Sequence, residues 1–256
     1  MPSADVRAAG AWEFGHCVMK HSGFPFSAAR SAPVPVSLAS AEEQASPYDG
    51  MQPRRQSFEF QYENSHFSQA HAYLVPKIDR ILRDLNPSSV FEIGAGNGSI
   101  ARHLASRYKI VGIDPSRTGI EQSRRANPSV ELVLGSGYDD LQARFGQFDC
   151  VLSVEVIEHL FEPRLFAKRM FELVAPGGTA IVTTPYHGYL KNLALAFTGR
   201  MDQHFTALWD GGHIKFWSVR TLRALLSEAG FRNIRFEFAG RIRPLAKSMI
   251  ATAQRP

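Results

Sequence analysis

The sequence predicts an α/β protein built on a doubly wound, mostly parallel β-sheet. Between residues 89 and 183, short β-type runs alternate with segments of helical periodicity. The connections are short and each crossover carries a helix, which is the pattern of parallel strands covered by helices. The run Phe148–Val154 is almost continuously apolar, as is typical of a strand buried on both faces.

The expected elements follow one another in a regular order. Strands are predicted at residues 89–94, 110–114, 130–134, 148–154 and 179–183, and helices at 99–108, 118–126 and 163–174. Apolar residues at helical spacing from 74 to 85 predict an earlier helix. Ser218 is expected to cap a last helix that ends at Gly230. No helix separates the final strands, 233–238 and 248–253, so they are antiparallel neighbours or a hairpin with a long loop.

The chain is interpreted as a disordered N-terminal extension, residues 1–50, and one folded domain, residues 51–256. Small residues, serines and prolines break any apolar period in the extension; a targeting peptide and a translation start at Met51 are the alternatives. Residues 58–86 are first aromatic and then helical, and we expect a helical lid there, with core packing as the alternative for the aromatic residues. Residues 185–217 interrupt the alternation and are interpreted as an inserted substrate lid.

The composition indicates a globular protein from a reducing compartment. The chain is 44% hydrophobic and 21% charged. Its two cysteines, Cys17 and Cys150, imply no disulfide framework, and no apolar run is long enough to span a bilayer, so a cytoplasmic location is expected. The net charge is +5, but the basic residues are scattered. This favours a solvated surface over a nucleic-acid or anionic-membrane patch.

A glycine-rich loop is the first candidate site. Gly94, Gly96 and Gly98 lie between an expected strand and an expected helix, so a cofactor can lie against bare main chain at the end of the strand. A dinucleotide fingerprint would need a glycine where this chain has Ser99. Asp114 ends the next strand, close to the ~20-residue offset at which an acid binds ribose hydroxyls. Together these residues favour a nucleoside cofactor without a pyrophosphate.

Four runs resemble, in order and spacing, the motifs of class I S-adenosylmethionine-dependent methyltransferases: VFEIGAGNG (90–98), VGID (111–114), FDCV (148–151) and LVAPGG (173–178). Within that superfamily, the run EVIEH (155–159), followed by a long insert with His213, is similar to the ubiquinone-biosynthesis O-methyltransferase branch. The resemblance covers about residues 90–253. It implies a Rossmann-like sheet of seven strands, with the last strand antiparallel between its neighbours.

The resemblance also implies how the cofactor, S-adenosyl-L-methionine, would be held. Glu92, Gly94 and Gly96 would surround its methionine part, and Asp114 would hold its ribose. Gly98 completes the glycine loop.

Two further positions follow from the same resemblance. Val154 matches a position that lines the cofactor in the ubiquinone branch. Ser136 stands where many members place an acid that meets the adenine amino group. Asp139 would replace it only if its loop bends.

A second candidate site combines carboxylates with imidazoles. Glu155, Glu158 and His159 lie at i, i+3 and i+4, and they point to one side if a helical turn follows the strand before them. Such a set suits Mg²⁺, Mn²⁺ or Zn²⁺, and methyltransferases with a similar run bind metal; His213 or His187 would complete it. The alternative is an acid–histidine hydrogen bond without metal. His159 and Glu158 are also the candidate catalytic residues, because a metal-free His159 can act as general base.

The sequence therefore predicts an enzyme, an O-methyltransferase that uses S-adenosylmethionine. The expected reaction is in-line methyl transfer to a hydroxyl oxygen of a small, phenolic or lipid-like acceptor. An RNA ribose 2′-O-methyltransferase, which would need a continuous basic groove, and a cofactor-binding interaction protein without turnover are the alternatives; Ser99 disfavours a nicotinamide dehydrogenase. The expected partner is a small molecule rather than a nucleic acid. Peripheral membrane contact and the oligomeric state stay open.

Overall fold

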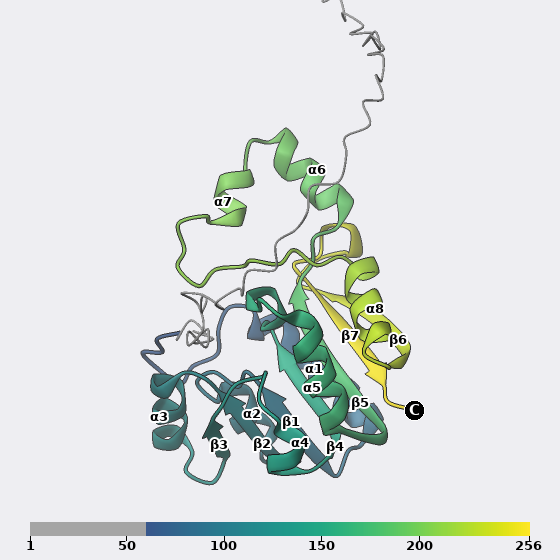
Figure 1. Cartoon of the computed structure of the whole chain (residues 1–256). Helices are drawn as coiled ribbons and strands as arrows, with labels where there is room; N and C mark the ends of the chain where they lie inside the picture. Colours follow the sequence, from purple (N-terminus) through teal and green to yellow (C-terminus); the bar gives the residue numbers. More distant parts are fainter. Residues whose placement is uncertain (1–59) are drawn as a thin grey trace, which may run out of the picture. The chain divides into compact units, whose positions relative to one another are not determined.

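A central β-sheet of seven strands organises the chain, of which the computed structural model describes residues 60–256 (Figure 1). The predicted extension over residues 1–50 lies outside the described residues. The strand order is β3-β2-β1-β4-β5-β7-β6. The strands are β1 (Ser89–Ile93), β2 (Lys109–Asp114), β3 (Glu131–Leu134), β4 (Phe148–Val154), β5 (Val174–Pro185), β6 (Arg232–Ala239) and β7 (Ser248–Gln254).

The sheet is parallel from β3 to β5, and β7 runs antiparallel to both of its neighbours, β5 and β6. This confirms the predicted doubly wound, mostly parallel sheet with its last strand inserted between neighbours. The strand order reverses between β1 and β4. Open α/β sheets bind ligands beyond the carboxyl ends of the strands at such a switch point.

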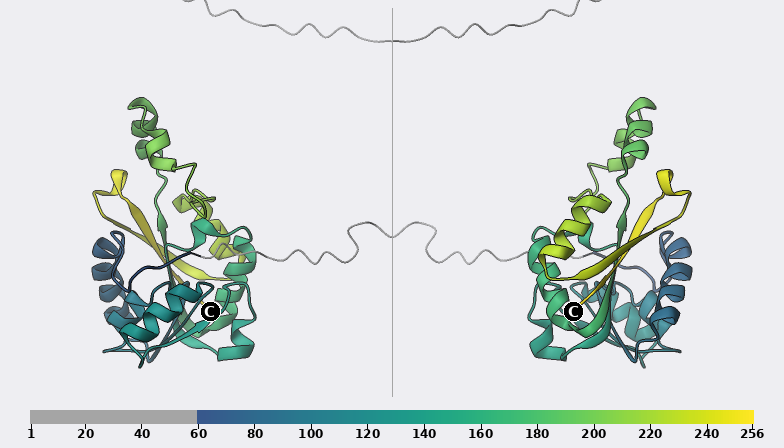
Figure 2. Two further views of the ribbon diagram at one scale, coloured as in Figure 1. Left: turned by 90° about the vertical axis from the view of Figure 1, so that its left-hand side faces the viewer. Right: turned by 90° about the vertical axis from the view of Figure 1, so that its right-hand side faces the viewer.

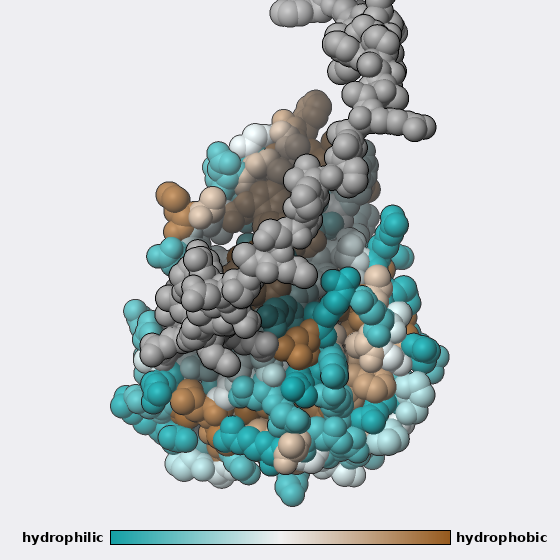
Figure 3. All heavy atoms as spheres, viewed as in Figure 1, coloured by the Kyte–Doolittle hydropathy of each residue, from teal (hydrophilic) through white to brown (hydrophobic). Residues whose placement is uncertain are grey.

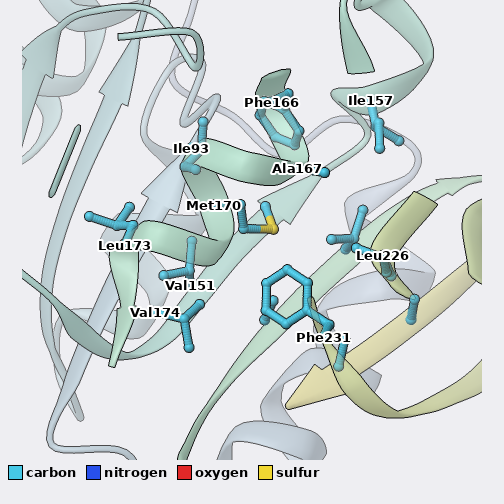
Figure 4. Packing of buried hydrophobic residues seen from close by; sticks show 14 of the residues in the cluster. Ile93, Val151, Ile157, Phe166, Ala167, Met170, Leu173, Val174, Leu226 and Phe231 are labelled. Atoms are coloured by element: carbon cyan, nitrogen blue, oxygen red, sulfur yellow. The ribbon is translucent and has the colours of Figure 1, made fainter. Parts of the chain in front are cut away.

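Helices cover both faces of the sheet (Figure 2). They are α1 (His71–Leu85), α2 (Ser99–Leu104), α3 (Arg117–Ala126), α4 (Leu141–Phe145), α5 (Pro163–Leu173), α6 (Tyr189–Phe197), α7 (Met201–Phe205) and α8 (Val219–Glu228), with short 3₁₀ turns η1 (Ile157–His159) and η2 (Arg243–Leu245). One buried cluster joins α1, α2 and α3 to the sheet, and a second joins α4, α5 and α8 to it. Figure 4 shows Phe166 and Met170 of α5 in the second cluster with Leu226 of α8 and Phe231.

The predicted elements differ from the observed ones mainly at their ends. Helix α2 stops at Leu104 rather than at residue 108. Strand β5 begins at Val174, before Pro176-Gly177-Gly178, because a register shift opposite Phe148 and Cys150 accommodates these residues as a bulge. Helix α4 was not predicted, since its five residues, capped by the Asp140 side chain, are too short to show a period.

Residues 60–86 and 185–217, the described parts of the two segments expected to form lids, lie at different places relative to the sheet. Helix α1 packs on the sheet through Leu74, Val75, Ile78, Ile81 and Leu82, whereas residues 60–69 before it lie at a cavity described below. Helices α6 and α7 of the insert stand beyond the carboxyl ends of the strands, at the top of Figure 1, and bury none of their residues. Among the described residues, no helix combines the length and apolar character needed to cross a membrane.

Candidate active site

The glycine loop joins β1 to α2, and two of its glycines are required for different reasons. Gly96 has φ of 55°, and a Cβ there would lie 2.7 Å from the hydroxyl oxygen of Tyr62, which stands over it. Gly98 has φ of 71°, and a Cβ there would overlap Ser123 and Leu132. Gly96 thus makes room for the Tyr62 ring at the site, and Gly98 lets the loop pack against α3 and β3.

Asp114, at the end of β2, is fixed against this loop. Its Oδ2 accepts a 2.7 Å hydrogen bond from the Gly96 N–H, and its Oδ1 accepts one of 2.8 Å from the Ser116 N–H. The side chain is buried with only 6% exposure. Two main-chain donors therefore set the carboxylate at the point where a cofactor ribose is expected.

Glu92, in β1, is a second buried acid beside the loop. Its Oε2 has no hydrogen-bond partner among the described residues. Burial raises the pKa of Glu92 to about 8, and the nearby Asp114 carboxylate contributes in the same direction. A buried carboxylate oxygen without a donor is costly, so Glu92 is suited to a cationic donor such as an ammonium group.

One cavity of about 1450 Å³ unites most of the predicted site residues. Its walls include Glu92, Gly94, Gly96, Asp114, Val154, Glu155, His159 and His213. Gly98, Ser136 and Glu158 are not among the lining residues. The Ser136 N–H donates to the Asp139 carboxylate at 2.8 Å, and the Ser136 hydroxyl accepts from the Tyr138 N–H. These bonds tie Ser136 and Asp139 into the loop, and Tyr138 is the residue of this loop that lines the cavity.

The carboxylate and imidazole groups meet at η1. One ligand atom each from Glu158, His159 and His213 lie within 4.8 Å of one another. Glu158 is 1% exposed, and neither of its carboxylate oxygens has a hydrogen-bond partner among the described residues. Burial raises the pKa of Glu158 well above its ordinary value, and Glu155 raises it further. The arrangement leaves a buried acid beside two imidazoles.

The tautomer of His159 follows from its partners. Its Nδ1 lies 2.8 Å from the Gly211 carbonyl oxygen and 3.2 Å from that of Gly212. Carbonyls only accept, so Nδ1 carries the proton and Nε2 is an acceptor. Burial lowers the pKa of His159 and lowers that of His213 to about 4, which keeps both imidazoles neutral near pH 7.

The insert is attached to this turn by hydrogen bonds that its residues donate to main-chain carbonyl oxygens of the turn. The N–H groups of Ile214 and Lys215 both donate to the Glu158 carbonyl oxygen at 2.9 Å. The Trp217 indole N–H donates to the Ile157 carbonyl oxygen at 3.3 Å. These bonds bring His213 to Glu158 and His159 across more than fifty residues of sequence.

Glu155 does not join this group. Its φ of 53° turns the chain before η1 begins at Ile157, so the expected helical turn does not include it. Its carboxylate accepts hydrogen bonds from the hydroxyls of Thr183, at 2.9 Å, and Ser248, at 3.3 Å. Burial raises the pKa of Glu155 to about 7. Glu155 is thus held by β5 and β7.

His187, the other histidine considered for the set, also lies apart. Its ring packs among His204, Phe205 and Phe216, with centroid distances of 5.0–5.8 Å. It is buried, and neither ring nitrogen has a hydrogen-bond partner among the described residues. Tyr138 is a cavity residue that is not predicted from the sequence. Tyr62 belongs to the aromatic run for which a lid is one expectation, but that run gives no individual role to Tyr62.

The chain is similar in sequence to known methyltransferases. A family model described as a methyltransferase domain matches residues 66–235. A ubiquinone biosynthesis O-methyltransferase of Azorhizobium caulinodans is 34% identical over 161 residues, which cover 59% of this chain and 62% of that protein. The chain thus spans less than two thirds of that relative's length.

Solved structures share the fold. The methyltransferase domain of a bacterial CtHen1 has a TM-score of 0.55 at 23% identity, covering 71% of this chain and 97% of that one. A magnesium protoporphyrin IX methyltransferase from Synechocystis was solved with bound SAH (S-adenosylhomocysteine). It has a TM-score of 0.54 at 19% identity, and the match covers 72% of this chain and 82% of that one.

Proposed function

Because this chain belongs to the methyltransferase domain family, we propose that it transfers a methyl group from S-adenosylmethionine to a hydroxyl oxygen of a small acceptor. The similarity to a ubiquinone biosynthesis O-methyltransferase supports a hydroxyl as the acceptor group. The observation that carries the proposal is the fixed pair of Asp114 and Gly96 beside the unpartnered Glu92 oxygen.

The residues at the glycine loop fit the cofactor. Asp114 is held by two N–H groups in a position to accept hydrogen bonds from the ribose. The buried Glu92 oxygen would accept a hydrogen bond from the cofactor's ammonium group, and Gly94 and Gly96 line the same cavity, where the methionine part would lie. When bound, S-adenosylmethionine supplies a methyl group activated by a positively charged sulfur. The protein's part is to position that group and the acceptor.

His159 is the proposed general base. Its Nδ1 proton is engaged by the Gly211 and Gly212 carbonyls, so Nε2 is free to take a proton from an acceptor hydroxyl. The lowered pKa of His159 keeps it unprotonated at neutral pH. The neighbouring Glu158 would stabilise the imidazolium that forms.

Alternatively, Glu158, His159 and His213 would bind a divalent cation. The two unpartnered oxygens of Glu158, with His159 and His213 beside them, form a donor set that Mg²⁺, Mn²⁺ or Zn²⁺ accepts. These three residues would hold the ion, which would lower the pKa of a coordinated acceptor hydroxyl. His159 cannot then serve as base through the nitrogen that coordinates the metal.

The acceptor is proposed to be phenolic or lipid-like, because several aromatic side chains line the cavity. Phe60, Phe161, Phe205 and Trp209 line it. No lysine or arginine is among the described residues that line this cavity. Since a polyanion would require cations there, the RNA alternative is not favoured.

The insert supports contact with a lipid surface that would carry an apolar acceptor. Tyr189, Phe197 and Leu208 of the insert are 78%, 92% and 98% exposed, and Figure 3 shows hydrophobic residues over α6 and α7. Exposed Arg241 and Arg243 lie beside exposed Ile242 near η2. Apolar groups flanked by cations suit an anionic bilayer surface. Pelleting with anionic vesicles but not with neutral ones would support this contact, and absence from both pellets would contradict it.

A labelled-cofactor assay tests the proposed function. The chain is incubated with methyl-labelled S-adenosylmethionine and a panel of phenols, catechols and ribonucleosides, with and without chelator. Label transfer to a hydroxyl acceptor, lost in His159→Ala, is expected. Binding of the cofactor without transfer to any acceptor would instead favour an interaction protein without turnover.

A further inference from the structure

Residues 60–67, called the strap here, run along the cavity beside the glycine loop and α3. Side chains of the glycine loop, of its flanking helices and of Ser116 donate hydrogen bonds to most of the strap's carbonyl oxygens. Ser116 donates to Phe60, Gln122 to Glu63, Asn97 to both Asn64 and His66, and Arg102 to Ser65, at 2.5–3.1 Å. The strap is therefore positioned by the same elements that form the expected cofactor site.

Tyr62 projects from the strap into a slot between two glycines. A Cβ on Gly96 would lie 2.7 Å from the Tyr62 hydroxyl oxygen, and a Cβ on Gly119 would lie 3.0 Å from the Tyr62 ring. The Tyr62 N–H donates to the Thr118 hydroxyl at 3.0 Å, which fixes the residue from which the ring projects. The ring can occupy this place only because both neighbouring residues lack side chains.

The Tyr62 hydroxyl lies near both acids of the site. Burial raises the pKa of this phenol, and the carboxylates of Asp114 and Glu92 raise it further. The hydroxyl is therefore neutral under all conditions in which the protein would work. Its oxygen carries partial negative charge in a site of low polarity, where a dipole acts more strongly than it does in water.

The covalent structure of the cofactor indicates what Tyr62 would contact. In S-adenosylmethionine the sulfur joins the methionine part to the ribose. If Glu92 holds the methionine part and Asp114 holds the ribose, a hydroxyl that lies over Gly96 and near both acids is placed close to the sulfur. We propose that Tyr62 is a cofactor-binding residue whose hydroxyl oxygen lies against the positively charged sulfur, with the strap covering the bound cofactor.

This assignment rests on the proposed function. It adds that the site would bind S-adenosylmethionine more tightly than S-adenosylhomocysteine. The substrate cofactor carries a sulfonium cation, whereas the product, S-adenosylhomocysteine, carries a neutral thioether. An oriented phenol oxygen and the Asp114 carboxylate attract the cation and not the thioether. Tyr62 would thus favour binding of substrate over product and assist product release after transfer.

Calorimetric titration of the full chain with S-adenosylmethionine and with S-adenosylhomocysteine tests the assignment. The variants are Tyr62→Phe, which removes only the oxygen, and Tyr62→Ala, which empties the slot. Tyr108→Phe, half-buried like Tyr62 but beside Arg107 and outside the cavity lining, is the matched control. Thermal melting of each variant checks that the domain folds.

Tyr62→Phe is expected to weaken S-adenosylmethionine about tenfold, equivalent to about 1.4 kcal/mol, while S-adenosylhomocysteine affinity changes less than threefold. Tyr62→Ala is expected to weaken both, and Tyr108→Phe neither. Equal loss for both ligands in Tyr62→Phe, or no loss for either, overturns the contact with the sulfur. Failure of the unaltered chain to bind either ligand overturns the proposed function itself, so the two failures are distinguishable.

Discussion

The main-chain N–H of Gly96 donates a 2.7 Å hydrogen bond to Oδ2 of Asp114, linking the loop after β1 to the end of β2. The bond orients the carboxylate before any ligand arrives. It also holds the glycine loop and the acid together at one cavity although eighteen positions separate them in the sequence. A preoriented acceptor binds a ribose with less loss of side-chain freedom than a mobile one.

Gly98 is expected to matter for stability more than for ligand contact. Gly98→Ala introduces a Cβ at φ of 71° that overlaps Ser123 and Leu132, whereas Gly199→Ala introduces one at φ of 64° in open space. Urea denaturation should show a loss of about 2–5 kcal/mol for Gly98→Ala, from strain and overpacking, and about 1–2 kcal/mol for Gly199→Ala. Equal losses would show that loop packing does not require Gly98.

Glu92 should make the protein less stable as pH rises. Its folded-state pKa of about 8 lies above the ordinary value of 4.5, so the native state keeps a proton that the unfolded chain has lost. This contribution is fully present below about pH 4.5 and is lost as pH rises through about 8. Relative to Glu92→Gln, the free energy of unfolding of the unaltered chain should fall by up to ~1.4 kcal/mol per pH unit across this window.

The matched control for this measurement is Glu131→Gln, at an exposed position of β3. It should follow the unaltered chain at every pH. If the free energy of unfolding changed with pH in the same way for Glu92→Gln and the unaltered chain, Glu92 would ionise normally in the folded protein.

Metal binding at the Glu158, His159 and His213 group can be measured without an activity assay. If the group holds a divalent cation, Mg²⁺, Mn²⁺ or Zn²⁺ should raise the melting temperature of the chelator-treated protein. At a cation concentration of about a hundred times the dissociation constant, binding should raise the free energy of unfolding by about 2.7 kcal/mol. Glu158→Gln should abolish the gain and exposed Glu121→Gln should retain it. A melting temperature that no cation changes in the unaltered chain would leave His159 as the base without metal.

The strap should affect cofactor affinity through residues that do not touch the cavity. Thr118 accepts the Tyr62 N–H and is not among the cavity-lining residues. Thr118→Val keeps the shape and removes the hydroxyl, so S-adenosylmethionine binding should weaken about 2- to 12-fold. Thr198→Val, on an exposed part of the insert, serves as the control. Unchanged affinity in Thr118→Val would show that the strap needs no anchoring at this point.

The fold and the place of the glycine loop could be predicted because their signals are local. Strand runs, helical periods and the spacing of Gly94, Gly96 and Asp114 depend on neighbours within about twenty residues. The resemblance to known methyltransferases added the inserted antiparallel strand, which periodicity alone left open as a hairpin. The single-turn helix α4 was missed because five residues show no repeat.

The rest of the site depends on contacts that the sequence does not display. Whether Glu155 joins Glu158 depends on where η1 begins and on a backbone φ of 53°, set by hydrogen bonds to Thr183 and Ser248 from other strands. Tyr62 reaches the glycine loop because Asn97, Ser116 and Thr118 hold the strap. These are long-range arrangements, and no spacing rule encodes them.

The central claim is that Asp114 and the glycine loop bind S-adenosylmethionine. Calorimetric titration of the unaltered chain and of Asp114→Asn, with Asp84→Asn on the exposed face of α1 as control, tests it most directly. Saturable one-to-one binding is expected, weakened about 10- to 150-fold in Asp114→Asn, because hydrogen bonds to a charged acceptor contribute about 1.5–3 kcal/mol. No binding by the unaltered chain, or equal binding by Asp114→Asn, would contradict it.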